Sequence, residues 1–150
     1  MQKSLAATFV LLISACIGSA QDKSAIQVMI GASPEQIKKA ALTMFTRNGY
    51  TIDSETPTQL KISKPFSAEE TATYNTAHWT NQPVENCRHV HAFLMSPADD
   101  STNVTMATEM VCYYDRQRMI RRNANEQENQ FIHSTLADLK TRIQETNRRH

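Results

Sequence analysis

The sequence predicts an α+β domain over residues 26–147, with an antiparallel sheet of about five strands and two helices, plus a weaker third helix candidate, on one face. Three observations predict this class. Short β-rich runs and amphipathic segments follow one another in the order β-α-β-β-(α)-β-β-α. Two pairs of the β-rich runs are separated by turn-forming residues, as in antiparallel hairpins. The length of 150 residues matches one globular domain with one core.

The first two elements are a short strand and an amphipathic helix. Residues 26–30 (IQVMI) form a β-rich run, which Gly31 ends. In the next segment Ser33 is a candidate N-cap, Gln36 completes a capping box, and Gly49 is placed to terminate the helix. The apolar residues of this helix fall on one face at helical spacing: Ile37, Ala40, Ala41, Met44 and Phe45.

A hairpin and a weaker helix follow. The β-rich stretches YTID and QLKIS flank SETPT, in which Pro57 and the small polar residues favour a turn. Residues 67–79 (SAEETATYNTAHW) begin with Ser67 and Glu70 in capping-box spacing. Threonines are weak helix formers and the apolar stripe is thin, so the local signal for this helix is weaker than for the others.

The last element is a helix with a narrow apolar stripe. Asn125 and Glu128 form a capping box before the stretch EQENQFIHSTLADLKTRIQE. Its stripe consists of Ile132, Leu136, Leu139 and Ile143, which is typical of a helix lying on a sheet. This order of elements, over most of residues 26–146, resembles the helix-grip and TATA-binding-protein-like modules of some bacterial envelope lipoproteins. Antiparallel hairpins with helices collected on one face predict a two-layer domain.

Two cysteines sit at equal distances from one turn in the stretch CRHVHAFLMSPADDSTNVTMATEMVC. We expect residues 84–95 and 104–115 to form a hairpin that is symmetric about Asp99 and Asp100. Cys87 then faces Cys112, at a Cα separation of roughly 4.5 to 5.5 Å that allows a disulfide. The alternative is two reduced cysteines buried as small hydrophobic groups. In this register Phe93, Met95, Val104, Met106 and Met110 share one apolar face with the cysteines and with His89 and His91.

The first residues are typical of an export signal. Residues 1–15 contain Lys3 and then a short uncharged apolar run, too short to span a bilayer as a permanent helix. Residues 13–16 (ISAC) resemble the bacterial lipobox, which implies that Cys16 becomes the lipid-bearing first residue, with residues 16–25 as a tether. The rival prediction is cleavage after Ala20 by an ordinary signal peptidase. Either route leaves Cys87 and Cys112 as a pair.

Few residues of the sequence suggest a catalytic or binding role. His89 and His91 can lie on one side of a strand with His78 as a third metal ligand, but no carboxylate is expected near them, and buried neutral histidines are the alternative. Four arginines in the charged connection before the last helix are the best candidate for binding a partner: Arg116, Arg118, Arg121 and Arg122. Trp79 is a further contact candidate, with core packing as the alternative. There is no glycine-rich phosphate loop, Gly-x-Ser-x-Gly, His-Glu-x-x-His or Cys-x-x-Cys motif in the sequence.

The sequence therefore predicts a non-enzymatic envelope lipoprotein with a membrane-tethered binding or adaptor domain. Its partners would be the membrane, through the lipid anchor, and an envelope protein or anionic lipid. In Gram-negative lipoproteins, aspartate after the lipidated cysteine is the usual retention signal. Ile17 at this position therefore resembles the sequence of lipoproteins that are sorted to the outer membrane, where the domain would face the periplasm. Removal of residues 1–15 leaves equal numbers of acidic and basic residues, which argues against a nucleic-acid binder. No cofactor is expected. A soluble periplasmic or secreted binding protein or inhibitor is the second hypothesis, and a metal-binding or enzymatic protein is the third.

Overall fold

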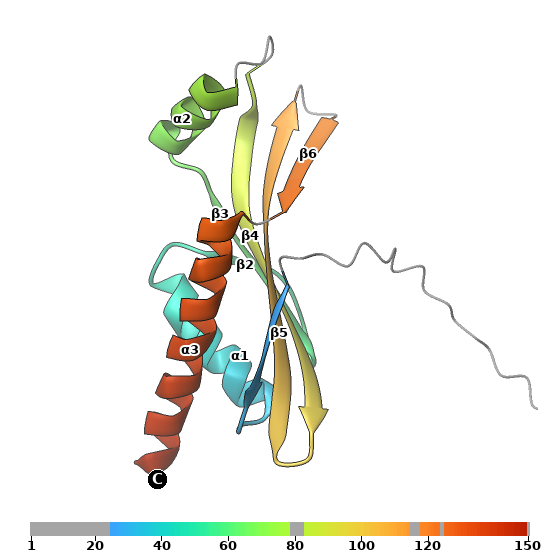
Figure 1. Cartoon of the computed structure of the whole chain (residues 1–150), viewed down its shortest axis with the longest axis vertical. Coiled ribbons are helices and arrows are strands. Elements are labelled where there is room, and N and C mark those ends of the chain that lie inside the picture. The colour runs from blue at the N-terminus through green and yellow to red at the C-terminus, as the bar shows by residue number, and fades with distance from the viewer. Residues whose placement is uncertain (1–24, 79–82, 115–117, 124, 150) are drawn as a thin grey trace, which may run out of the picture.

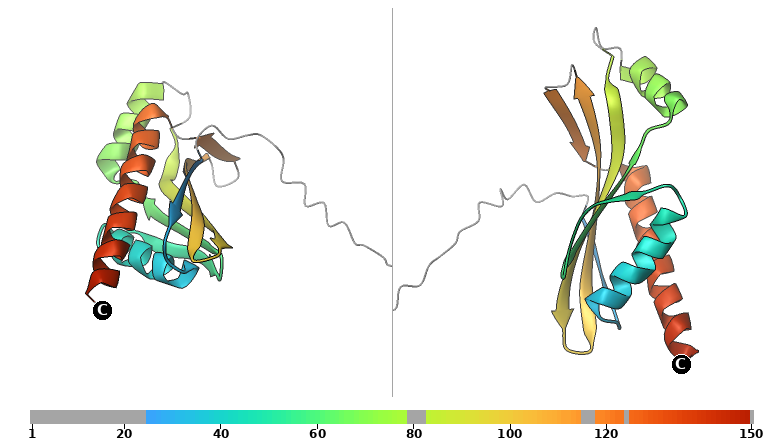
Figure 2. Two further views of the ribbon diagram at one scale, coloured as in Figure 1. Left: turned by 60° about the horizontal axis from the view of Figure 1, so that its bottom comes forward. Right: turned by 180° about the vertical axis from the view of Figure 1, so that it is seen from behind.

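The computed structural model describes residues 25–78, 83–114, 118–123 and 125–149, and for residues 118–123 it describes the backbone. The elements in chain order are β1 (Ile26–Ile30), α1 (Pro34–Thr46), β2 (Thr51–Thr56), β3 (Gln59–Pro65), α2 (Ala68–His78), β4 (Glu85–Ala98), β5 (Ser101–Tyr114), β6 (Arg118–Asn123) and α3 (Glu126–Arg148). In this described part, six strands form one antiparallel sheet (Figure 1). The three described helices lie on the same side of the sheet (Figure 2). The predicted α+β class is confirmed, and so are the predicted elements.

The long hairpin of β4 and β5 is the centre of the sheet, and its predicted register is confirmed. His89 faces Met110, His91 faces Thr108, and the pairing continues to Ala98 and Ser101. Asp99, at the turn, has a φ of 48°, in the left-handed region that aspartate tolerates better than most residues. The alternation of side chains therefore places Phe93, Met95, Val104 and Met106 in the core, where all four are buried.

Strand β6 was not predicted from the sequence. We expected the stretch with Arg118, Arg121 and Arg122 to be a charged connection, but it pairs with β5 from Glu109 to Tyr114. Strand β1 pairs with β5 only from Thr102 to Met106, so β1 and β6 lie one after the other along the same edge of β5. The backbone groups of the second half of β5 need partners, and β6 supplies them despite its polar composition.

The two strong helices begin where the capping boxes predicted and bury the predicted stripes. Ser33 Oγ accepts from the Gln36 backbone N–H at 3.3 Å, and Asn125 Oδ1 accepts from the Glu128 N–H at 2.9 Å. Ile132, Leu136, Leu139 and Ile143 of α3 are all buried. Of the five apolar residues predicted for α1, Ile37, Ala41 and Phe45 are buried, and Ala40 and Met44 are partly buried.

Most of the buried apolar side chains form two clusters on the helix side of the sheet. The larger cluster lies between the sheet and the pair α1 and α3. The smaller one contains Val84, Cys87, Met110 and Cys112, with Phe66 and Tyr74 packed against it, and lies beneath α2. In Figure 1, α2 covers the opposite end of the sheet from α1. None of the helices in the described ranges is both long enough and apolar enough to cross a membrane.

Candidate functional site

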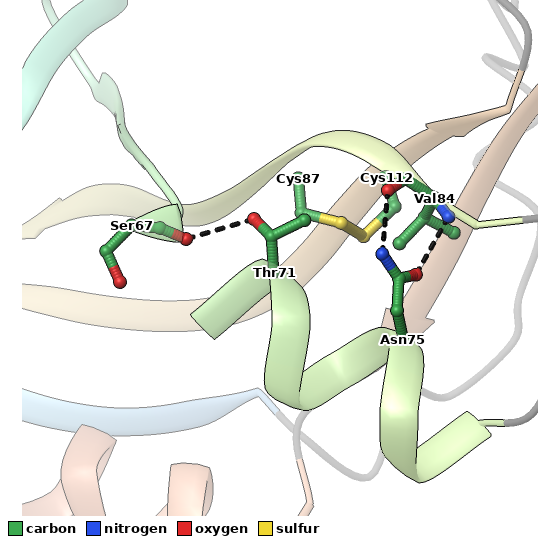
Figure 3. Close-up of a disulfide and its surroundings, with 6 residues drawn as sticks. All are labelled: Ser67, Thr71, Asn75, Val84, Cys87 and Cys112. Carbon is green, nitrogen blue, oxygen red and sulfur yellow. Dashed lines mark hydrogen bonds between the residues drawn. A yellow bond between two sulfur atoms is a disulfide. The ribbon is translucent and has the colours of Figure 1, made fainter. Parts of the chain in front are cut away.

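The predicted pair of cysteines forms a disulfide beneath α2 (Figure 3). Cys87 and Cys112 have Cα atoms 4.0 Å apart, and their exposed fractions are 1% and 0%. Between Glu85 and Arg88 the register shifts, and Asn86 has a φ of 53°, so a bulge precedes Arg88 that the symmetric hairpin did not predict. The disulfide joins neighbouring strands at one end of the sheet, as expected from the register.

Hydrogen bonds, rather than a broad apolar face, hold α2 over the disulfide. The side chain of Asn75 accepts from the Val84 N–H at 2.9 Å and donates to the Val84 carbonyl oxygen at 3.2 Å (Figure 3). At the other end Glu70 and Ser67 form the predicted capping box, with distances of 2.7 and 3.1 Å. The predicted helix is confirmed, and the thin apolar stripe is explained because Asn75 supplies part of the attachment.

Substitution of Asn75 by alanine should loosen α2. The change removes both bonds to the buried Val84, and we expect the free energy of unfolding to fall by about 1 to 3 kcal/mol. Hydrogen exchange of the α2 amides should accelerate more than that of α3. Thr73→Ala, at an exposed position of the same helix, serves as the control. Unchanged exchange in the Asn75 variant would contradict this role.

The two histidines of the HVH stretch lie on β4 between the two apolar clusters. The His91 ring contacts Phe45 of the larger cluster, and the His89 ring contacts Phe66 beside the smaller one. His91 is 2% exposed, its Nδ1 lies 2.8 Å from Thr108 Oγ1, and its Nε2 lies 2.9 Å from Tyr50 Oη. Its ring also stacks on Phe131, with the ring centroids 5.3 Å apart. Burial, with the neighbouring His89 as a second cause, lowers the pKa of His91 to about 3. His91 is therefore neutral at physiological pH, as the buried-histidine alternative predicted.

The expectation that no carboxylate reaches these histidines is wrong. Glu70, from α2, lies with its Oε1 3.3 Å from His89 Nε2, and the His89 ring lies 4.3 Å from the Phe66 ring. The pKa of Glu70 is lowered, mainly by the hydrogen bond from the Ser67 backbone N–H. Burial raises the pKa of Tyr50, and the charge of Glu70 adds to this effect.

The arrangement of these side chains does not match a metal centre. Both ring nitrogens of His91 already have hydrogen-bond partners. Within residues 25–78, 83–114 and 125–149 there is no group of three or more histidine, cysteine, aspartate or glutamate side chains placed to hold a metal ion. His78, the predicted third ligand, ends α2, and its side chain lies outside the described part.

A groove that we did not predict runs between α1 and the end of α3. Its volume is about 660 Å³. The charged side chains that line it are Lys39, Arg47, Arg142, Arg149 and Glu145. The sequence does contain two basic residues about two turns apart on each of these helices. Nothing in the linear sequence shows that the two pairs of basic residues face one groove. We call this feature the α1–α3 groove.

Of the residues predicted to bind a partner, Arg118, Arg121 and Arg122 lie in β6, where the backbone alone is described. Cys16, Trp79 and Arg116 lie outside the described residues. The fold and these sites define a class, a disulfide-linked α+β two-layer domain with a cationic groove on its helical side. Neither the family models, nor the curated proteins, nor the solved structures contain a match to this chain.

Proposed function

We propose that the chain is a non-enzymatic binding or adaptor domain, tethered to a membrane of the bacterial envelope by a lipid on Cys16. The buried Cys87–Cys112 disulfide is the observation that carries this proposal. Disulfides persist in oxidising compartments and are rare in the cytosol, so the bridge supports export of the chain. Export agrees with the signal-like residues 1–15 and with the lipobox-like ISAC stretch.

The distance from the proposed anchor to the domain favours action close to the membrane. Strand β1 begins at Ile26, which leaves a polar stretch of about ten residues after Cys16, with a relaxed reach of roughly 17 Å. That reach is shorter than helix α3, whose 23 residues span about 35 Å, so the partner would lie on or near the bilayer. None of the described helices covers the opposite face of the sheet, and Met29 and Leu94 are 53% and 48% exposed there.

Detergent partitioning of the mature protein tests the proposal. The wild-type protein should enter the detergent phase, whereas the Cys16→Ser variant should stay in the aqueous phase because it lacks the lipid-bearing thiol. The Ala20→Arg variant is the matched control, since it blocks cleavage after Ala20 and leaves the lipobox intact. A wild-type protein that stays in the aqueous phase, or a mature protein that begins at Gln21, would favour the soluble periplasmic or secreted alternative.

A further inference from the structure

The α1–α3 groove gathers positive charge from two helices. Lys39 and Arg47 belong to α1 and its C-cap, Arg142 and Arg149 belong to α3 and its C-cap, and Glu145 is the acidic residue among them. Among the described residues, Lys39, Arg47 and Arg149 have no carboxylate within ion-pair distance. The groove therefore has an excess of unpaired cations.

Arg142 is oriented by its own helix. Its Nε lies 2.9 Å from Asp138 Oδ2, one turn earlier in α3. This bond uses the inner nitrogen of the guanidinium group and leaves the terminal nitrogens without a described partner. A guanidinium held in this way can still donate two parallel hydrogen bonds to a phosphate or carboxylate group.

Helix dipoles explain only part of this charge. Cations at helix C-termini offset the partial negative charge of the last carbonyl groups, which accounts for Arg47 and Arg149. Lys39 lies in the middle of α1, and Arg142 lies two turns before the end of α3. These two positions gain little from the dipoles, because the effect is confined to the terminal turn.

Apolar and uncharged polar side chains lie among the charged ones in the groove, and its volume is that of a site for a small organic ligand. Ala40 and Ile143 line it between the charged side chains, and Ile143 is 4% exposed. Small-molecule sites typically occupy about 300 to 1,000 Å³ and combine apolar surface with a few charged groups. A volume of about 660 Å³ exceeds the space that a bare phosphate ion needs. The best fit is therefore a ligand that carries both an anionic group and an apolar segment.

We propose that the α1–α3 groove binds the phosphate-bearing headgroup of an anionic lipid. The phosphate would lie between Lys39, Arg47 and Arg142, and the glycerol with the first methylene groups would lie over Ala40 and Ile143. This proposal adds a ligand to the proposed function. It rests on the proposed function because export and tethering bring the groove to a membrane. Binding by charge to a lipid surface adds a second, weaker attachment to the lipid on Cys16.

Titration of the Cys16→Ser chain with soluble short-chain lipids tests the proposal without the anchor. The probes are dihexanoylphosphatidylglycerol and dihexanoylphosphatidylcholine as monomers, inorganic phosphate, and an oligoglutamate peptide. Heat of binding and amide chemical shifts are measured. We expect the anionic lipid to bind about tenfold more tightly than the zwitterionic one, with shifts in α1 and the end of α3, and to bind less tightly as salt is added.

Three variants separate the groove from general charge. Arg47→Glu should weaken binding of the anionic lipid by about tenfold, and Glu145→Gln should strengthen it several-fold. Lys61→Glu is the control for net charge. Lys61 lies opposite Ala92 in the β3–β4 register, on the face of the sheet away from the helices, so this variant should bind the anionic lipid as tightly as the parent chain does. Equal losses in Arg47→Glu and Lys61→Glu would overturn the groove as the site.

The other probes decide the ligand. Inorganic phosphate that binds as tightly as the anionic lipid would overturn the lipid headgroup in favour of free phosphate, and tighter binding of oligoglutamate would overturn it in favour of an acidic protein. Equal affinity for the two lipids would also overturn it. Each of these failures is distinct from failure of the proposed function, because detergent partitioning depends on Cys16 and the titration uses a chain without it.

Discussion

The Cys87→Ala/Cys112→Ala double variant should lose about 3.5 kcal/mol of its free energy of unfolding. The disulfide closes a loop with a sequence separation of 25. Opening that loop increases the conformational entropy of the unfolded chain, which on the chain-entropy model is worth about 3.5 kcal/mol. Both sulfurs are buried, so their removal also takes apolar contacts from the small cluster beneath α2.

Urea unfolding followed by circular dichroism measures this effect. Wild-type protein unfolded in dithiothreitol should approach the stability of the double variant, because both lack the crosslink. Cys16→Ser is the control and should unfold like the wild type, since Cys16 is not part of the bridge. A difference below about 1 kcal/mol between the double variant and the wild type would show that the crosslink contributes little to stability.

Acidification should destabilise the domain through His91. Its pKa lies near 3 in the folded protein and near the ordinary value of 6.5 in the unfolded chain. Below 6.5 the unfolded chain therefore binds a proton that the folded protein does not, so the stability is complete above 6.5 and is lost as the pH falls toward 3. The limiting slope is roughly 1.4 kcal/mol per pH unit, so the total loss is several kcal/mol.

Urea unfolding at about pH 7 and about pH 5 measures this slope while limiting the contribution of Glu70, whose ordinary pKa is 4.5. The His91→Gln variant should lose most of the pH dependence in this interval, because glutamine can hydrogen-bond to Tyr50 and Thr108 but does not titrate. His133→Gln, at an exposed position of α3, is the matched control and should keep the slope of the wild type. Equal slopes in the wild type and in His91→Gln would contradict the assignment.

The register of the central hairpin was predictable from Arg88 and Val111 to the turn because its pattern is local, and the bulge before Arg88 was not predicted. The turn at Asp99 and Asp100 sets one register, and that register buries one alternating set of side chains and brings Cys87 opposite Cys112. The capping boxes at Ser33 and Asn125 were predictable from the sequence for the same reason, because each box involves two residues only three positions apart.

Contacts between distant elements were not predictable. Glu70 and His89 meet because α2 folds over the end of β4, and no pattern in either segment indicates this contact. Strand β6 was missed because its composition is polar, and its pairing depends on the edge of β5 that β1 leaves uncovered. The side chains of the predicted arginines in β6 are not described, so their role as a binding site stays a prediction.

The sequence by itself determined the helices, the strands of the long hairpin, the disulfide and the register that allows it, because hydrophobic periodicity, caps and turn residues act over a few neighbouring positions. Only the tertiary structure decided that α2 brings Glu70 to His89, that His91 is enclosed by Tyr50 and Phe131, and that α1 and α3 align two basic stripes along one groove. The physical reason is that helices pack through their apolar faces onto the sheet, and this packing sets which of their polar side chains become neighbours.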